Sequence, residues 1–390
     1  MLTLPPLALY IHIPWCIRKC PYCDFNSHES TSIPEQAYAE QLLRDLQHDL
    51  HWVQERKLHS IFFGGGTPSI FNGDTIKFIL QGVQQCIPFE DNIEITLEAN
   101  PGTAEAEKFW AFRQAGVNRL SLGIQSFNAA HLNKLGRIHD NTQALRAVTM
   151  AQAAGFERIN IDLMHGLPEQ TKQQALDDLQ QAINLGVSHV SWYQLTIEPN
   201  TVFYSHPPTL PVDETLWDIQ QAGLLLLQEH GFIQYEVSAF SKAPDPLTGI
   251  YVSGTGNQCR HNLNYWQFGD YLGIGAGAHG KMTLPAENRI IRYSKTRAPK
   301  HYLERTDNYY AEQHDIALLE RPAEFMMNAL RLQDGVAASL YPQRTGLTLP
   351  SLAAICEPLQ QKGLMVKSTD RIATTSQGFL FLNDVLADIL

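Results

Sequence analysis

Long apolar runs are missing from this sequence. No stretch of about 18 apolar residues is present, which is the least that a membrane-spanning helix needs. The apolar residues 2–13 lack a basic leader and a small-residue cleavage site and include Pro5 and Pro6, unlike a signal peptide. We therefore expect a cytoplasmic protein with at most a peripheral contact to a membrane.

Basic residues are also in short supply. Lys and Arg number 29 against 40 Asp and Glu, so the formal net charge is -11. Nucleic-acid binding needs a basic face that neutralises phosphates, so nucleic acid is excluded as a main partner. The remaining composition, 44% hydrophobic and 18% charged, is that of an ordinary globular protein.

Cysteine is scarce as well, and its distribution is uneven. Three of the six cysteines are scattered without a disulfide framework, as expected in a reducing cytoplasm: Cys86, Cys259 and Cys356. The other three form a C-x3-C-x2-C motif: Cys16, Cys20 and Cys23. Iron–sulfur clusters normally take four cysteines. Three thiolates therefore suggest a [4Fe–4S] cluster whose fourth iron is open to another ligand.

Two other uses of clustered cysteines fit less well. Zinc sites favour paired C-x2-C groups and four nitrogen or sulfur ligands, and no fourth cysteine or nearby histidine pair completes such a set. A disulfide interpretation fails because three neighbouring cysteines cannot all pair.

Short apolar runs alternate with amphipathic stretches over the first 240 residues. The expected strands are 7–13, 60–63, 93–98, 119–124, 159–163, 190–195 and 233–239. The expected helices are 35–55, 74–86, 104–115, 141–154, 172–185 and 213–230. Such alternation predicts an α/β fold with a parallel sheet. Six or more units indicate a full or partial (β/α) barrel, whose ligands bind at the C-terminal ends of the strands.

The rest of the chain differs in pattern. Residues 241–310 are rich in Gly, Asn, His and Tyr and predict loops with short strands. From about Ile316 the pattern is helical again, with a helix at 352–362, a hairpin at 364–366 and 372–374, and a last helix at 378–389. This order is typical of a winged-helix-like module. We therefore expect three parts, 1–240, 241–310 and 311–390.

Polar motifs follow the expected strands. Gly64, Gly65 and Gly66 precede Thr67, and glycines let a backbone approach a ligand closely. Glu98 follows the third strand, where a carboxylate suits a ribose hydroxyl or an ammonium group, although it is also close to a helix start. The next strands contribute the remaining candidates: Gln125; Arg137, whose guanidinium suits a carboxylate but which taken alone is a surface arginine; and Asp162, which interrupts an apolar run and is costly to bury alone.

In this order the motifs resemble those of the radical S-adenosylmethionine (SAM) superfamily. Over residues 7–300 they closely resemble those of the oxygen-independent coproporphyrinogen III oxidase family. The resemblance implies that SAM chelates the open iron and that the glycine run contacts its amino group. It makes Tyr10, Gly65, Thr67, Glu98, Gln125, Arg137 and Asp162 candidates for the SAM site, with Tyr22 placed to pack on the adenine. Without the resemblance, Tyr10 is ordinary barrel core.

Two departures distinguish the chain from the oxidase. The oxidase has a further cysteine two positions after the third, where this chain has Phe25, and a longer segment before the cluster. Residues 261–266, His-Asn-Leu-Asn-Tyr-Trp, resemble the H-N-x-x-Y-W motif of HemW-type heme chaperones. That resemblance implies heme binding, with His261 as an iron ligand, since imidazole commonly ligates heme iron. Tyr265 and Trp266 would offer flat apolar surface to the porphyrin.

Other residues near these motifs have open roles. His279, in a glycine-rich loop, is either a second heme ligand or a SAM contact. Cys259 is interpreted as a bystander. Without the resemblance, residues 261–266 are a polar loop anchored by its aromatic side chains.

Three hypotheses follow. The first is a heme chaperone that binds a [4Fe–4S] cluster, SAM and heme and passes heme to acceptor proteins such as respiratory enzymes. The second is a radical SAM oxidoreductase acting on a porphyrinogen. The third is a radical SAM enzyme with an unrelated substrate, in which His261 is structural. Whether SAM is cleaved and whether the chain forms a homodimer are left open, and no catalytic residue is assigned.

Overall fold

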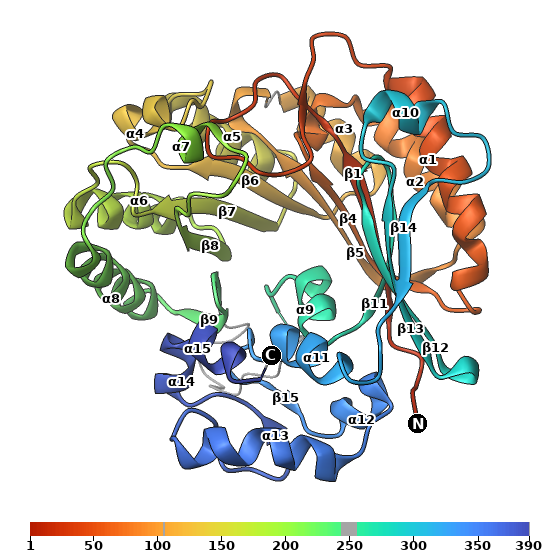
Figure 1. Ribbon diagram of the computed structural model, residues 1–390. Coiled ribbons are helices and arrows are strands. Elements are labelled where there is room, and N and C mark those ends of the chain that lie inside the picture. Colours follow the sequence, from red (N-terminus) through yellow and green to blue (C-terminus); the bar gives the residue numbers. More distant parts are fainter. Residues whose placement is uncertain (104–105, 243–255, 390) are drawn as a thin grey trace.

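The computed structural model describes residues 1–103, 106–242 and 256–389, and over these ranges its main feature is a twelve-stranded mixed sheet (Figure 1). The strand order is β14-β13-β12-β11-β1-β4-β5-β6-β7-β8-β10-β9. Since β1 and β8 are not paired with each other, the sheet stays open and forms a partial barrel. No helix of the described residues is long and apolar enough to cross a membrane.

The first half of the chain builds most of the parallel part of this sheet. Its strands are β1 (Leu7–Ile13), β4 (Leu58–Gly65), β5 (Phe89–Ala99), β6 (Arg119–Gln125), β7 (Arg158–His165) and β8 (His189–Gln194). Its helices are α1 (Glu35–Asp49), α2 (Gly73–Cys86), α3 (Ala106–Ala115), α4 (Ala129–Lys134), α5 (Asn141–Ala153), α6 (Lys172–Asn184), α7 (Val202–Ser205) and α8 (Asp213–Glu229). The predicted α/β partial barrel is confirmed.

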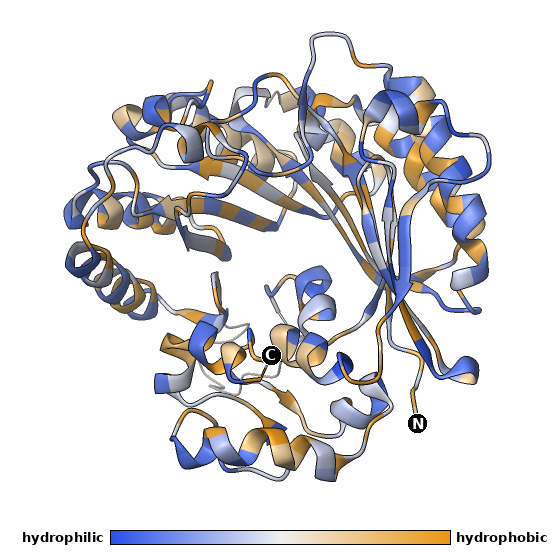
Figure 2. Cartoon of the chain, in the orientation of Figure 1, coloured by the Kyte–Doolittle hydropathy of each residue, from blue (hydrophilic) through white to orange (hydrophobic). Residues whose placement is uncertain are grey.

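Local signals explain where these elements begin and what they bury. The Asp140 side chain caps α5 and forms a capping box with Gln143, and Thr171 does the same for α6 with Gln174. Nearly every residue of β1 is buried, as expected for a strand covered on both faces. Figure 2 shows apolar residues along the strands and in stripes on the helices, which is how the helices pack on the sheet.

One expected strand, 233–239, is two strands. β9 (Phe232–Glu236) and β10 (Ala239–Lys242) form an antiparallel hairpin, and β10 also pairs with β8. The chain turns at Val237 and Ser238, where the Glu236 carboxylate accepts the Ser238 N–H at 3.2 Å and the Val237 N–H binds the Arg331 carbonyl. The apolar pattern runs through this turn, so the sequence does not reveal it.

The range 241–310, expected to be loop-rich, contains regular structure in its described part. After α9 (Arg260–Trp266), β11 (Asp270–Ile274) pairs in parallel with β1. The sheet then continues through β12 (His279–Leu284), β13 (Arg289–Lys295) and, after α10 (Pro299–Leu303), β14 (Tyr310–Asp315). Glycine interrupts the apolar alternation that marks a strand, so the sequence pattern is obscured here. The glycine is needed for close packing, because a side chain at Gly280 would overlap the Tyr293 ring.

The C-terminal part is helical and has its own core. It contains α11 (Arg321–Ala329), α12 (Leu340–Thr345), α13 (Leu349–Gln361), α14 (Ser376–Leu380) and α15 (Leu382–Ala387), with β15 (Val336–Ala337) paired to β16 (Arg371–Ile372). The expected hairpin is reduced to a bridge between Met365 and Thr374, flanked by two backbone bonds, from Val366 to Ala373 and from Thr375 to Leu364. The expected last helix is broken at Phe381, whose backbone leaves the helical region.

Short elements complete the described structure. A small ladder pairs β2 (Trp15–Cys16) with β3 (His28–Glu29), and 3-10 turns occur at η1 (Leu50–Trp52), η2 (Pro68–Ile70), η3 (Pro101–Thr103) and η4 (Pro285–Glu287).

Candidate functional site

A cavity of about 630 Å³ lies where the parallel strands end, and we call it the cysteine cavity. The segment after β1 contributes the three clustered cysteines, and the turn after β4 and the strands β5, β6 and β7 each contribute polar residues. Its lining includes most of the predicted site: Cys16, Cys20, Tyr22, Cys23, Gly65, Gly66, Thr67, Glu98, Gln125, Arg137 and Asp162. The parallel sheet therefore brings together residues that are far apart in the sequence.

Each of the three thiols has a polar neighbour. Thr67 Oγ1 donates to Cys16 Sγ at 3.5 Å, and Arg137 Nη1 donates to Cys20 Sγ at 3.6 Å. Cys23 Sγ lies 3.8 Å from the Ser27 hydroxyl. Burial raises the pKa of the Cys16 and Cys23 thiols, which disfavours free thiolates in the cavity.

The donor set fits an iron–sulfur cluster better than a single ion. Within the described ranges, no three His, Cys, Asp or Glu side chains are arranged to hold one metal ion. A [4Fe–4S] cluster takes each cysteine on a different iron, so its ligands line a cavity together without converging on one point. Three thiols on one wall, with donors from Thr67 and Arg137 to two of the sulfurs, meet this requirement.

Close packing requires glycine at positions 65 and 66. Gly65 has φ +113°, and a Cβ there would lie 2.6 Å from the His12 ring. A Cβ at Gly66 would overlap the Trp15 carbonyl. The backbone N–H of Gly66 donates to Ile13 at 2.7 Å and that of Thr67 to Trp15 at 2.8 Å. These bonds fasten the cysteine loop to the end of β4.

Two half-buried carboxyl groups face the cavity. Glu98 Oε2 accepts the Gly65 N–H at 3.3 Å, and burial together with the charge of Asp162 raises the pKa of Glu98 to about 8. Asp162 accepts bonds from the Ser121 hydroxyl at 3.0 Å and the Asn160 amide at 2.7 Å, while burial raises its pKa. A cationic ligand bound beside these carboxyl groups would favour their ionised form and displace the proton.

Gln125 and Arg137 are held in place by neighbours. Gln125 has φ +72°, an uncommon backbone conformation, and its Oε1 accepts the Tyr193 hydroxyl at 2.7 Å. Arg137 donates to the Gly123 carbonyl as well as to Cys20, and it is half-buried. Its cavity position differs from the exposed one expected of an isolated arginine. Tyr193 was not predicted. It lies two positions after Ser191 in β8, so both side chains are on the same face of the strand, and both line the cavity.

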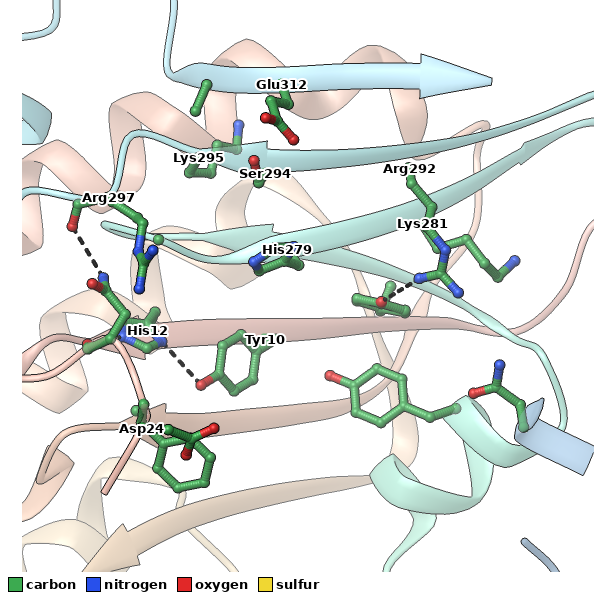
Figure 3. Close-up of a pocket in the computed structure, with 18 of the residues that line it drawn as sticks. Tyr10, His12, Asp24, His279, Lys281, Arg292, Ser294, Lys295, Arg297 and Glu312 are labelled. Atoms are coloured by element: carbon green, nitrogen blue, oxygen red, sulfur yellow. Dashed lines mark hydrogen bonds between the residues drawn. The ribbon is translucent and has the colours of Figure 1, made fainter. Parts of the chain in front are cut away.

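A second cavity of about 850 Å³ adjoins the first, and we call it the aromatic cavity (Figure 3). Its lining contains no cysteine; Gly65, Glu98 and Phe25 line both cavities. Aromatic and cationic side chains predominate: Tyr10, His12, Tyr265, Trp266, Phe268, Tyr271, His279, Lys281, Arg292, Lys295 and Arg297.

Tyr10 and the two aromatic residues of the predicted heme motif line this second cavity. The Tyr10 hydroxyl lies 3.0 Å from His12 Nδ1, and burial raises the pKa of Tyr10. Tyr10 is absent from the lining of the cysteine cavity, and Gly64 lines neither. Tyr265 and Trp266 both line the aromatic cavity, with their ring planes at 64° to each other.

His261 lies elsewhere. It is only 1% exposed and lines neither cavity. Its Nδ1 lies 3.1 Å from the Ser60 hydroxyl and its Nε2 lies 2.8 Å from the Tyr265 hydroxyl. Helix α9 directs it onto β4, and burial lowers its pKa, so the ring is neutral but both nitrogens are occupied.

Comparison with known proteins agrees with the geometry. Residues 10–182 match the Radical SAM superfamily and residues 316–381 match the HemN C-terminal domain. The solved coproporphyrinogen III oxidase (HemN) of Escherichia coli shares the fold, with a TM-score of 0.81 at 22% identity, covering 99% of this chain and 90% of that one. The open barrel, the cysteine triad and the matched domain define a radical SAM protein.

Relatives over the full length narrow this class. Heme chaperone HemW of Haemophilus influenzae is 51% identical over 391 residues, covering 99% of this chain and 98% of that protein. Heme chaperone HemW of Escherichia coli is 46% identical, with 99% and 98% covered, and that of Bacillus subtilis is 33% identical, with 98% and 99% covered. The chain belongs to the HemW heme chaperone family.

Proposed function

We propose that this chain is a cytoplasmic heme chaperone that holds a [4Fe–4S] cluster and SAM and delivers heme to acceptor proteins such as respiratory enzymes. The observation that carries the proposal is the pair of adjoining cavities, one with the cysteine triad and one with an aromatic lining. Relatives named heme chaperones match nearly the whole chain, so both cavities lie within the matched length. All six cysteines are free thiols, which suits a reducing compartment.

Cys16, Cys20 and Cys23 would hold the cluster. When bound, the cluster supplies an electron for reductive cleavage of the SAM sulfonium. Thr67 and Arg137 donate to two of the cysteine sulfurs, and such donors stabilise thiolate ligands. The bonds from Gly66 and Thr67 to the strand before the triad hold the loop in register.

The residues around the triad would bind SAM. Glu98 would face the ammonium or a ribose hydroxyl, with Asp162 close enough to raise the pKa of Glu98. Arg137 would face the SAM carboxylate, and Gln125 would be steadied by Tyr193. Tyr22, which packs against Phe203 with ring centroids 6.4 Å apart, would cover the adenine.

Porphyrinogen oxidation is the second candidate, favoured by the fold shared with the solved oxidase. At 22% identity this likeness shows the fold alone. Phe25, which is 64% exposed and lines both cavities, stands where the resemblance expects the further cysteine of the oxidase. We therefore propose the chaperone function before the oxidase function.

Two measurements on anaerobically reconstituted protein separate these candidates. Titration with heme, followed by the Soret band, is expected to saturate at a fixed stoichiometry. Incubation with coproporphyrinogen III, SAM and a reductant is expected to yield no decarboxylated product. Product formation together with weak, unsaturable heme binding would replace the proposal with the oxidase function.

A further inference from the structure

His279 and Arg297 line the aromatic cavity without the hydrogen bonds and ion pairs that hold its tyrosines, its other histidine and its other cations. In Figure 3 they lie at the same end as Tyr10 and His12, while Lys281 and Arg292 lie at the other end. Both are exposed, His279 at the start of β12 and Arg297 just after β13. This arrangement leaves one imidazole and one guanidinium available to a ligand.

The other possible iron ligands in the cavity already have partners. The Tyr10 hydroxyl and His12 Nδ1 lie 3.0 Å apart, and His12 Nε2 lies 2.8 Å from the Asn26 carbonyl. Tyr265 is paired with His261, and the Tyr271 hydroxyl accepts from Arg292 at 3.2 Å. For the His279 ring, by contrast, no hydrogen bond is found within the part of the chain that the structure describes.

The cations differ in the same way. Lys281 is paired with Asp270 at 2.9 Å, and Lys295 with Asp45 at 2.6 Å. Arg292 is paired with Glu324 at 2.5 Å. The guanidinium of Arg297 has no ion pair among the described residues. A guanidinium without a partner suits a carboxylate, which it can bind with two hydrogen bonds.

The wall of the cavity complements these two groups. Tyr265, Trp266 and Tyr271 are partly exposed to it, and the ring centroids of Tyr265 and Tyr271 are 4.5 Å apart in an edge-on arrangement. The volume of about 850 Å³ is near the upper end for ligand pockets. A large flat molecule that carries a metal with an open coordination position and carboxylates at its edge matches this lining.

We propose that the aromatic cavity is the heme seat, with His279 as the iron ligand and Arg297 as the partner of a heme propionate. This inference rests on the proposed chaperone function and specifies its cargo site. In this conformation His261 acts as a positioning residue, since its ring holds the hydroxyl of Tyr265 in the cavity wall. The shared wall at Gly65 and Glu98 places the heme seat beside the cysteine cavity.

The test is a heme titration of full-length, cluster-loaded protein. His279→Ala is expected to lose the spectrum of imidazole-ligated iron and to bind heme about tenfold to hundredfold more weakly, as for loss of a metal contact. His279→Cys is expected to change the Soret and EPR spectra to those of thiolate-ligated heme. Arg297→Ala is expected to weaken binding and leave the ligation spectrum unchanged.

Two histidine variants serve as controls. His230→Ala, at the exposed end of α8, is expected to match the wild type, and His261→Ala is expected to retain imidazole ligation. Cluster content and SAM affinity of each variant report on folding. Wild-type spectra for both His279 variants, or loss of ligation in His261→Ala alone, would overturn the assignment. If the wild type itself binds no heme saturably, the chaperone function fails, and the heme seat fails with it.

Discussion

The cysteine cavity and the aromatic cavity share a wall but are assembled in different ways. The first gathers residues from the C-terminal halves of parallel strands and from the loops that follow them. The second is enclosed by β1 and by strands that continue the sheet with antiparallel pairing, together with α9. The comparison shows that sequence motifs predict a site, such as the cysteine cavity, where the strand topology is regular. They fail for a site, such as the aromatic cavity, whose walls depend on pairing between distant, glycine-rich strands.

The strongest test of two separate sites is removal of a cluster ligand. Cys20→Ala is expected to reduce bound iron and sulfide to background, because the cluster would keep only two protein ligands. Heme binding is expected to persist, since no cysteine lines the aromatic cavity. Iron and sulfide analysis with a heme titration measures both. Cys86→Ala is the control. Loss of heme binding in Cys20→Ala would show that the two cavities form a single binding site.

The glycine run offers a graded test of how the cysteine loop is held. Gly66→Ala is expected to cost about 1–3 kcal/mol of unfolding free energy, the range for overpacking, and to impair cluster assembly. The added methyl would meet the backbone of Trp15. Gly64→Ala is expected to cost less, because its Cβ would lie 3.0 Å from the Tyr10 side chain, which can shift. Denaturant unfolding measures both, and equal effects would contradict the packing argument.

The shared wall can be examined through Glu98. Its pKa of about 8 means that the free protein holds a proton there at neutral pH, and a SAM ammonium would displace it. SAM affinity is therefore expected to rise as pH increases toward 8, with proton release on binding. Calorimetry in buffers of different ionisation enthalpy counts the protons. Glu98→Gln is expected to lower that count, and an unchanged count would remove Glu98 from the SAM site.

The same group affects stability with a definite sign. The folded protein retains a proton on Glu98 that the unfolded chain releases above about pH 4.5, so its unfolding free energy falls as pH rises from 4.5 to 8. Glu98→Gln is expected to flatten this part of the pH profile, as measured by denaturant unfolding at several pH values.

The smallest expected effect concerns Tyr193. Tyr193→Phe removes the hydroxyl that donates to Gln125 at 2.7 Å and is expected to cost about 1 kcal/mol of unfolding free energy. SAM binding is expected to weaken slightly while heme binding is unaffected. Tyr204→Phe, on an exposed side chain, is the control. A larger effect on heme affinity than on SAM affinity would contradict the assignment of Tyr193 to the SAM site.

Prediction from the sequence succeeded where patterns are local. The parallel strands and their helices follow from apolar periodicity. Polar residues of β5, β6 and β7 line one cavity together with the turn after β4, as barrel topology requires. It failed at the β9–β10 turn, where apolar residues continue through the reversal, and in β11 and β12, where glycines interrupt the alternation. Tyr193 and Ser121 were missed because the sequence does not show whether a polar residue within a strand faces the cavity or the opposite side of the sheet.

His261 and His279 mark the limit most clearly. The sequence by itself determined the cysteine triad, the glycine run and the order of strands and helices, because spacing and periodicity are properties of neighbouring residues. Only the tertiary structure decided that both nitrogens of His261 are occupied and that His279 faces a cavity. Whether an imidazole is available depends on hydrogen-bond partners such as Ser60, some 200 positions away in the chain, and long-range packing alone brings those partners together.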